Sequence, residues 1–355
     1  MNTEKVLMKG NDAIAEAAIR AGCGAYFGYP ITPQNEIIAY MAQHMLDRGR
    51  VFIQAESEIA AMVMVYGASC AGARAMTSSS SPGMSLKQEG ISYAAGADVP
   101  CVIANVSRGG PGLGSIAPAQ SDYFQSTRGG GHGDYRCIVL APKSVQECVD
   151  LSYIAFDLAD LYRMPVIVLV DGTIGQMAEG VFLPPEKKME DLPKRHWVLG
   201  HMDGTERASR HITSMNLVPA DLEGLTRARF QRYETVEKNE TRFEESDCQG
   251  ADLVLCAYGT SARVCMGAKK LAEKEGIKVG LLRPITLWPF PKEALGKIAE
   301  SAKPILTVEM SLGQLVEDVR LTVLGKAPVH LLGHSGGVIP TEDEVFAEIR
   351  KILRK

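Results

Sequence analysis

The sequence predicts an α/β protein, with a doubly wound, mostly parallel sheet followed by a second α/β domain. Three observations predict this class. Short, continuously apolar segments alternate with helical patterns, which is typical of parallel strands covered by helices on both faces. A polar region over residues 183–250 interrupts this alternation, which then resumes. The 355 residues are enough for two domains that each have a core.

The first region begins with a helix that Asn11 or Asp12 is placed to cap and that Gly22 ends. Thr32 and Pro33 are predicted to be the N-cap and the first residue of a helix, because the fixed φ of proline suits the first helical position. No residue of 59–73 is charged, so we expect the helix over 57–72 to be buried on nearly every side. We expect further helices over 84–95 and 144–162, and strands over 25–29, 51–54, 74–78, 99–106, 138–140 and 165–170.

The region 183–250 has a different composition. Its run 237–245 is dense in charge and has no aliphatic side chain, which is typical of a surface excursion and a linker. We therefore expect two domains, over 1–235 and 250–355. The second is predicted to contain strands over 251–258, 278–282, 304–308 and 329–332, and helices ending at Glu275 and over 313–324 and 342–352.

Composition narrows the function. The net charge is −4 and the basic residues are scattered, so we expect no nucleic-acid or membrane surface. The first ten residues lack an apolar signal segment, and 59–73 is too short to span a bilayer, so we expect a cytoplasmic protein. The eight cysteines include no C-x-x-C pair, so we expect buried free thiols and no metal or iron–sulfur site within the chain.

Three polar residues, Thr32, Glu58 and Arg108, follow the ends of predicted strands, where open α/β sheets bind ligands. Glu58 has two interpretations. A carboxylate in a first helical turn favours the positive helix end, and a carboxylate in an apolar pocket can hydrogen-bond a ring nitrogen of a ligand. Glu56 competes for the second role, and proximity of the two acids would raise the pKa of one of them.

Thr32 and Arg108 also have two interpretations each. Thr32 is either a helix cap or a hydroxyl that meets a substrate oxygen at a helix N-terminus. Arg108 precedes a glycine-rich segment and suits a carboxylate ligand, or else it pairs with a surface acid such as Asp122. His132, in a second glycine-rich loop, is a weak candidate.

The phosphate-binding half of a cofactor site is absent. There is no G-x-x-x-x-G-K-[ST] and no G-x-S-x-G, and the glycines after Arg108 precede a long loop instead of the helix of a dinucleotide-binding fingerprint. Asp171-Gly172-Thr173 lacks both the preceding glycine and a suitably placed downstream asparagine that would hold Mg²⁺ and a pyrophosphate. We therefore expect a second polypeptide to complete the site.

At these residues the chain resembles the α subunit of 2-oxoacid:ferredoxin oxidoreductases, which are thiamine-pyrophosphate and iron–sulfur enzymes. The stretch 114–122 is most similar to the branched-chain type, which acts on 2-oxoisovalerate (3-methyl-2-oxobutanoate). Four motifs in order carry the resemblance: Gly28-Tyr29-Pro30-Ile31-Thr32-Pro33, Ser57-Glu58, Ser107-Arg108-Gly109-Gly110-Pro111-Gly112 and Val308-Glu309-Met310-Ser311-Leu312-Gly313-Gln314-Leu315.

The resemblance implies a thiamine-diphosphate-binding pyrimidine domain over 1–235 and a transketolase C-terminal-like domain over 250–355. It implies that Glu58 hydrogen-bonds the aminopyrimidine N1′, with Pro30 and Ile31 also at the cofactor, and that Thr32 and Arg108 contact the substrate. The thiamine pyrophosphate would be shared with a β subunit that holds the pyrophosphate and Mg²⁺. A γ subunit and a ferredoxin-like δ subunit, with [4Fe–4S] clusters on partner subunits, would complete an enzyme that uses coenzyme A, a 2-oxo acid and ferredoxin.

The substrate remains open between three 2-oxo acids. The apolar Ile116-Ala117-Pro118 favours a branched aliphatic side chain, whereas Arg128, His132 or Arg136 could supply the second cation that 2-oxoglutarate needs. Pyruvate is a further alternative. Two other hypotheses are the pyrimidine-binding subunit of a lipoamide-linked 2-oxoacid dehydrogenase and a non-catalytic scaffold.

Overall fold

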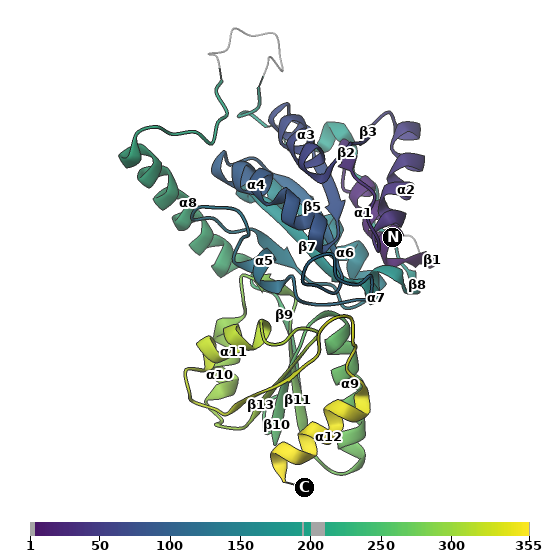
Figure 1. Cartoon of the computed structure of the whole chain (residues 1–355), viewed down its shortest axis with the longest axis vertical. Coiled ribbons are helices and arrows are strands. Elements are labelled where there is room, and N and C mark those ends of the chain that lie inside the picture. The colour runs from purple at the N-terminus through teal and green to yellow at the C-terminus, as the bar shows by residue number, and fades with distance from the viewer. Residues whose placement is uncertain (1–3, 194, 200–209, 355) are drawn as a thin grey trace.

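A seven-stranded and a five-stranded sheet organise the chain, of which the computed structural model describes residues 4–193, 195–199 and 210–354. The two sheets and their helices are stacked end to end along the long axis (Figure 1). The predicted α/β class, with mostly parallel sheets, is confirmed.

Six parallel strands make up most of the seven-stranded sheet, with a seventh, antiparallel strand at one edge. Their order across the sheet is β12 (Thr286–Trp288), β6 (Ile138–Leu140), β7 (Pro165–Asp171), β5 (Cys101–Ser107), β4 (Ala75–Ser79), β2 (Ala25–Gly28) and β3 (Val51–Gln54). The central strands β5 and β7 are buried along their whole length, because helices cover both faces.

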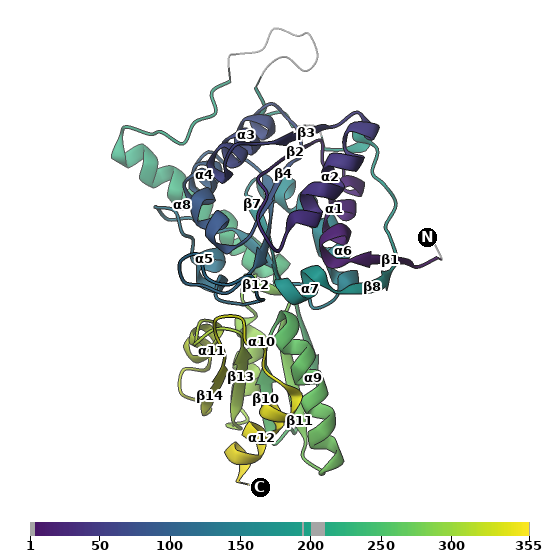
Figure 2. The ribbon, with the colours of Figure 1, turned by 45° about the vertical axis from the view of Figure 1, so that its right-hand side comes forward.

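Helices cover the two faces of this sheet in two groups, as Figure 2 shows. One group is α1 (Gly10–Arg20), α2 (Asn35–His44) and α6 (Val145–Tyr162), and the other includes α3 (Glu58–Cys70) and α4 (Ser81–Gly96). Ser57 begins α3 and Ser144 begins α6, since each hydroxyl accepts a hydrogen bond from the backbone three residues on.

The five-stranded sheet has the order β14 (Val329–Gly333), β13 (Ile305–Glu309), β10 (Leu253–Cys256), β11 (Val279–Pro284) and β9 (Phe243–Ser246). Its helices are α9 (Gly259–Lys274), α10 (Lys292–Ala299), α11 (Leu315–Val323) and α12 (Glu342–Leu353). The remaining elements are β1 (Val6–Lys9), β8 (Ala178–Val181), α5 (Tyr123–Thr127), α7 (Gly172–Gln176), α8 (Pro219–Glu240) and two short 3₁₀ turns, Leu46–Arg48 and Met189–Asp191.

Two helix starts differ from prediction. The first helix begins at Gly10 with Lys9 as N-cap, and Asn11 instead uses its amide to bind the Pro33 carbonyl oxygen at 2.7 Å. The expectation that Thr32 and Pro33 begin a helix is wrong as well, because the peptide bond between them is cis and α2 begins at Asn35.

The expectation that the uncharged helix is buried on nearly every side is also wrong. Ile59 and Val63 on α3 are 49% and 55% exposed. They lie one helical turn apart, so they form an exposed apolar stripe on the same helix that begins at Glu58.

The polar region is more ordered than expected. Residues 219–240 form α8, and 243–246 form β9, the edge strand of the five-stranded sheet. Helix α8 buries only a narrow stripe, in which Tyr233 packs edge to face against Trp288 at 5.6 Å and Arg229 pairs with Asp98 at 3.1 Å. All four residues of β9 are exposed, and the strand is held by its backbone pairing with β11 and by ion pairs of Glu244, which include Arg283 at 2.9 Å.

Buried hydrogen bonds join the two sheets at Gln120 and Asp171. The Gln120 side chain donates to the Tyr258 carbonyl oxygen at 2.9 Å and accepts from Ser261 Oγ at 2.8 Å and the Met310 N–H at 3.0 Å. Asp171, at the end of β7, accepts from the Thr260 N–H at 2.9 Å and the Thr260 hydroxyl at 2.6 Å. The loop after β5 and the end of β7 are therefore anchored on the second sheet.

All eight cysteines are buried and free, as expected. Among the described residues, none of the helices combines the length and the apolar composition that crossing a bilayer requires.

Candidate functional site

The carboxyl ends of four neighbouring strands form one edge of the large sheet. These strands, β5, β4, β2 and β3, are parallel and adjacent. The segments that follow them carry Arg108, Ser81, Thr32 and Glu58 respectively. The sequence prediction that Thr32, Glu58 and Arg108 share one edge is therefore confirmed, and this edge is the position where open α/β sheets hold ligands.

Glu58 is the first residue of α3 and only 6% exposed. No hydrogen bond from a described residue reaches its carboxylate, whose oxygens are not among the fully buried unpaired atoms and so remain accessible to a ligand. The carboxylate lies against Gly83 of α4, where an added Cβ would be 2.7 Å from Glu58 Oε1. This glycine leaves room for the acid, and the acid keeps its acceptor positions for a ligand.

Glu56 differs from Glu58 in its surroundings. It is exposed, whereas Glu58 is buried two residues later. Burial therefore distinguishes the two acids, because Glu58 is enclosed and Glu56 faces solvent.

Arg108 is 6% exposed and its guanidinium joins two loops. It donates to the Thr32 carbonyl oxygen at 2.8 Å and to the Leu113 carbonyl oxygen at 3.0 Å. Its Nε has no hydrogen-bond partner among the described residues. The guanidinium thus keeps donors free for an anion, while its contact with Thr32 brings these two candidates together.

Asp122 is not the surface partner of Arg108 that the sequence allowed. It is buried and accepts hydrogen bonds from Ser81 Oγ at 2.7 Å and Asn105 Nδ2 at 2.8 Å. Burial raises the pKa of Asp122, and the hydrogen bonds and the Arg108 charge oppose that rise. Since Ser81 Oγ also accepts from the Arg108 N–H at 2.9 Å, Asp122 supports the backbone of Arg108 indirectly.

Thr32, Ile31 and Pro30 line the open side of this edge. Thr32 and Pro30 are exposed and Ile31 is half-buried. The Thr32 hydroxyl accepts a long hydrogen bond from Asn35 at 3.5 Å, so it remains available to a ligand.

The three cations that could recognise a second carboxylate lie elsewhere or are engaged. Arg128 pairs with Asp318 of the second sheet at 2.9 Å, and Arg136 donates to the Tyr135 carbonyl oxygen at 2.9 Å. His132 is exposed, and its carbonyl oxygen accepts from Ser92 Oγ at 2.8 Å.

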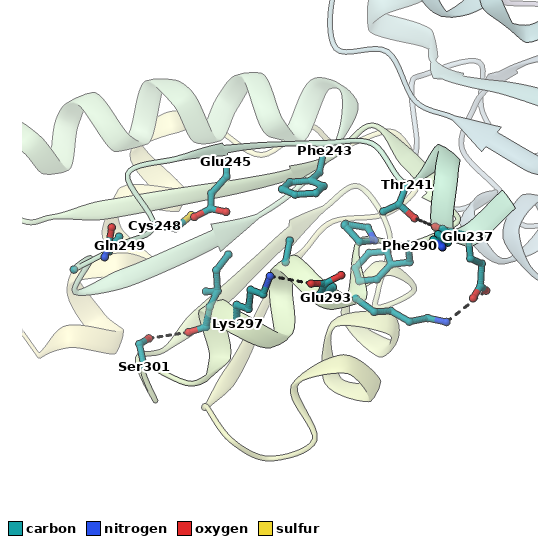
Figure 3. Close-up of a pocket in the computed structure, with 16 residues that line it drawn as sticks. Glu237, Thr241, Phe243, Glu245, Cys248, Gln249, Phe290, Glu293, Lys297 and Ser301 are labelled. Carbon is teal, nitrogen blue, oxygen red and sulfur yellow. Dashed lines mark hydrogen bonds and ion pairs between the residues drawn. The ribbon is translucent and has the colours of Figure 1, made fainter. Parts of the chain in front are cut away.

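A cleft of about 780 Å³ lies at a different place, between the end of α8, β9 and α10 (Figure 3). Four of its charged side chains form two pairs: Lys297 donates to Glu293 at 2.9 Å, and Lys292 lies 3.7 Å from Glu237. Thr32, Glu58 and Arg108 do not line it. A site that a second polypeptide completes is an open surface in one chain alone, so an enclosed cavity at Glu58 is not required.

Sequence analysis missed three residues around Glu58 and Arg108: Ser81, Gly83 and Lys87. All three lie on α4 and are buried. Lys87 follows Met84 by three residues and precedes Ile91 by four, so it falls on the buried stripe of its helix. A lysine at an apolar position was the signal that could have identified it.

The described residues hold no group of three or more histidine, cysteine, aspartate or glutamate side chains that could bind a metal ion.

Two family models match the chain. The model described as pyruvate flavodoxin/ferredoxin oxidoreductase, thiamine diphosphate-binding, matches residues 16–245. The model described as pyruvate:ferredoxin oxidoreductase core domain II matches residues 251–345.

Similar proteins carry related names. Ketoisovalerate oxidoreductase subunit VorB of Methanothermobacter marburgensis is 49% identical over 349 residues, which are 98% of this chain and 96% of that protein. The 2-oxoglutarate synthase subunit KorA of Archaeoglobus fulgidus is 41% identical over 322 residues, covering 89% of this chain and 91% of that protein.

Solved structures agree with the fold. A 2-oxoglutarate:ferredoxin oxidoreductase from Magnetococcus marinus, with 2-oxoglutarate, coenzyme A and succinyl-CoA bound, superposes with a TM-score of 0.87 at 29% identity. The match covers 99% of this chain and 65% of that one. A split-gene transketolase shares the fold, with a TM-score of 0.61 at 16% identity. With a thiamine-diphosphate-binding region matched over 16–245 and nearly full-length relatives, the chain belongs to the 2-oxoacid:ferredoxin oxidoreductase family as an enzyme subunit.

Proposed function

We propose that this chain is the α subunit of an oxidoreductase that converts 2-oxoisovalerate and coenzyme A to an acyl-CoA and CO₂ and passes the electrons to ferredoxin. The 49% identity to a ketoisovalerate oxidoreductase subunit supports the branched-chain substrate. The observation that carries the proposal is Glu58, a residue only 6% exposed whose carboxylate receives no hydrogen bond from a described residue and which lies at the ligand-binding edge of the sheet.

The residues at this edge fit the pyrimidine half of thiamine diphosphate. Glu58 would share a proton with a ring nitrogen of the pyrimidine, in the space that Gly83 leaves open. Pro30 and Ile31 would contact the ring from the loop after β2. When bound, the cofactor supplies stabilisation of the carbanion that decarboxylation generates.

We assign the substrate to Arg108 and Thr32. The free donors of the Arg108 guanidinium would hold the substrate carboxylate, and the Thr32 hydroxyl would meet the 2-oxo oxygen. Arg128 is engaged by Asp318, and the loop after Arg108 carries the apolar side chains of Leu113 and Ile116, which are 81% and 67% exposed. An aliphatic substrate side chain suits this apolar loop better than the second carboxylate of 2-oxoglutarate does.

We further propose a heteromeric enzyme, with domains over 1–235 and 250–355 in this chain. A β subunit would hold the pyrophosphate and Mg²⁺, and γ and δ subunits, with [4Fe–4S] clusters on partner subunits, would serve coenzyme A and ferredoxin. The exposed apolar stripe on α3, beside Glu58, supports a partner that covers this edge.

The test is Glu58→Gln in the complex co-expressed with its partners. We expect kcat to fall by roughly 10²-fold or more, because proton transfer by a positioned carboxyl contributes that much. The measurement is coenzyme A-dependent viologen reduction with 2-oxoisovalerate, 2-oxoglutarate and pyruvate. The matched control is Glu56→Gln, two residues away and exposed, which should keep wild-type turnover.

Three outcomes would contradict the proposal. Unchanged turnover in Glu58→Gln would favour the scaffold hypothesis. Reduction of lipoamide without reduction of viologen would favour the lipoamide-linked enzyme. A higher kcat/KM for 2-oxoglutarate or pyruvate would replace the substrate while keeping the site.

A further inference from the structure

A lysine is buried beneath the first turn of α3. Lys87, on α4, is 0% exposed. Its Nζ donates to the backbone carbonyl oxygen of Glu58 at 3.2 Å and to Thr77 Oγ1 at 3.1 Å. Because Lys87 lies one helical turn after Gly83, the same face of α4 makes room for the Glu58 carboxylate and holds the Glu58 backbone.

We propose that Lys87 is a positioning residue for Glu58: its amino group fixes the backbone of Glu58 and adds a titratable positive charge beside the carboxylate. The inference rests on the proposed role of Glu58 in binding the cofactor ring. Packing alone gives no reason for a charge here, since the neighbours of Lys87 along the buried stripe are Met84 and Ile91. An apolar residue would complete that stripe without the cost of burying an ammonium group.

Burial makes this charge sensitive to pH near neutrality. The pKa of Lys87 is lowered to about 7 by its burial, which the negative charge of Glu58 opposes. Glu58 on α3 and Thr77 on β4 are the groups that face its Nζ. Arg108 and Asp122 lie on the other side of the start of α4, where Ser81 binds both.

The direction in which Lys87 changes the affinity for the cofactor follows from the charge of its amino group. A proton held between Glu58 and a ring nitrogen adds a positive charge next to the lysine. A protonated Lys87 opposes that proton, and a neutral Lys87 does not. Loss of the lysine proton therefore favours cofactor binding as the pH rises through about 7, and this contribution opposes the weakening that comes from uptake of the proton shared by Glu58 and the ring nitrogen.

The experiment measures the dissociation constant of thiamine diphosphate, with Mg²⁺ in excess, on the assembled complex between pH 6 and 8.5, by quenching of intrinsic fluorescence. For the wild type we expect the dissociation constant to fall by about tenfold more between pH 6 and 8.5 than it does for Lys87→Met. Lys87→Arg stays charged over this range, so it should bind thiamine diphosphate weakly and should not show the additional fall in the dissociation constant. Thr77→Val removes the other hydrogen-bond partner of the lysine, which lowers the lysine pKa, so the change in the dissociation constant should move to lower pH.

The inference is overturned if Lys87→Arg follows the wild-type profile, and this variant decides the matter even if Lys87→Met does not assemble. Glu58→Gln separates the two proposals. If Glu58→Gln binds thiamine diphosphate as tightly as the wild type, the proposed function fails. If it binds weakly while the Lys87 variants keep the wild-type profile, only the role of Lys87 fails.

Discussion

Glu58 is placed by the shape of the neighbouring helix instead of by a hydrogen bond to its carboxylate. Gly83 lies where a side chain would meet Ser79 Oγ at 2.1 Å and Glu58 Oε1 at 2.7 Å. Real Cβ contacts do not approach that closely, so any other residue must displace the acid or the serine. The position of the carboxylate therefore depends on a residue that has no chemistry of its own.

Gly83→Ala tests this dependence. We expect at least about tenfold lower kcat in the assembled complex, because misplacement of a catalytic group by about 1 Å costs up to about a hundredfold. The measurement is viologen reduction at saturating 2-oxo acid. The fold should survive, since alanine favours a helix over glycine by up to about 1 kcal/mol.

Gly296→Ala is the matched control for that substitution. Gly296 is also in a helix, α10, and nothing lies within 4 Å of an added Cβ. It should keep wild-type activity and gain the same helix propensity. Equal activity of the two alanine variants would show that Gly83 does not place Glu58.

At the scale of elements, α3 has a buried N-terminal residue and an exposed apolar side. Its N-terminal residue Glu58 faces the ligand edge, and its side carries the exposed Ile59 and Val63. An uncharged helix that is not covered by its own chain is typical of a surface that a partner covers. The same helix would then bring the partner subunit to the cofactor.

Val63→Glu should prevent assembly with the partner subunits while leaving the chain folded, because a carboxylate buried in an apolar interface lacks a partner. Size-exclusion chromatography of the co-expressed subunits measures this. The matched control is Leu321→Glu on α11, where the leucine is 62% exposed and belongs to the second sheet. Loss of assembly in both variants, or in neither, would contradict an interface at α3.

Strands and helices with clear apolar periodicity were predictable, and those held by charge were not. The predicted strands over 51–54 and 138–140 match β3 and β6 residue for residue. Helix α8 was missed because its buried stripe includes Arg229 and Glu240, which pattern analysis counts as surface residues. The strand β9 was missed because an exposed edge strand needs no apolar side chain.

The site was predictable to the level of the sheet edge. Polar residues after strands identify that edge, because parallel strands end together. The residues that hydrogen-bond the backbone of Glu58 and Arg108 were not predictable. They are Lys87 and Ser81 on α4, and only the tertiary structure brings that helix next to Glu58 and Arg108. Thr32 was assigned to the right loop and the wrong helix start, since α2 begins at Asn35 with Gln34 as its N-cap.

At the scale of the whole molecule, the second sheet holds the loop that follows Arg108. Gln120 makes three buried side-chain hydrogen bonds to that half, and its backbone N–H also donates to the Met310 carbonyl oxygen at 2.9 Å. The loop that follows Arg108 is thereby fixed at Gln120. The second sheet thus contributes to the site by restraining this loop.

Gln120→Ala should lower the free energy of unfolding by about 2–4 kcal/mol, because it leaves buried partners such as Ser261 Oγ and the Met310 N–H unsatisfied. Denaturant unfolding of the chain measures this. The matched control is Gln146→Ala, which also removes three hydrogen bonds, to Asp150 and Phe182, but at the surface where water replaces them. Equal losses in both variants would show that burial at Gln120 is unimportant.

The strand β12 has a consequence for how such a chain can be cut. It belongs by sequence to the half matched over 251–345, yet it pairs antiparallel with β6 at the border of the larger sheet. A fragment that ended before residue 250 would leave β6 as an unpaired edge strand, which could pair with a strand of another molecule. The two halves should therefore be expressed and redesigned together, as one polypeptide.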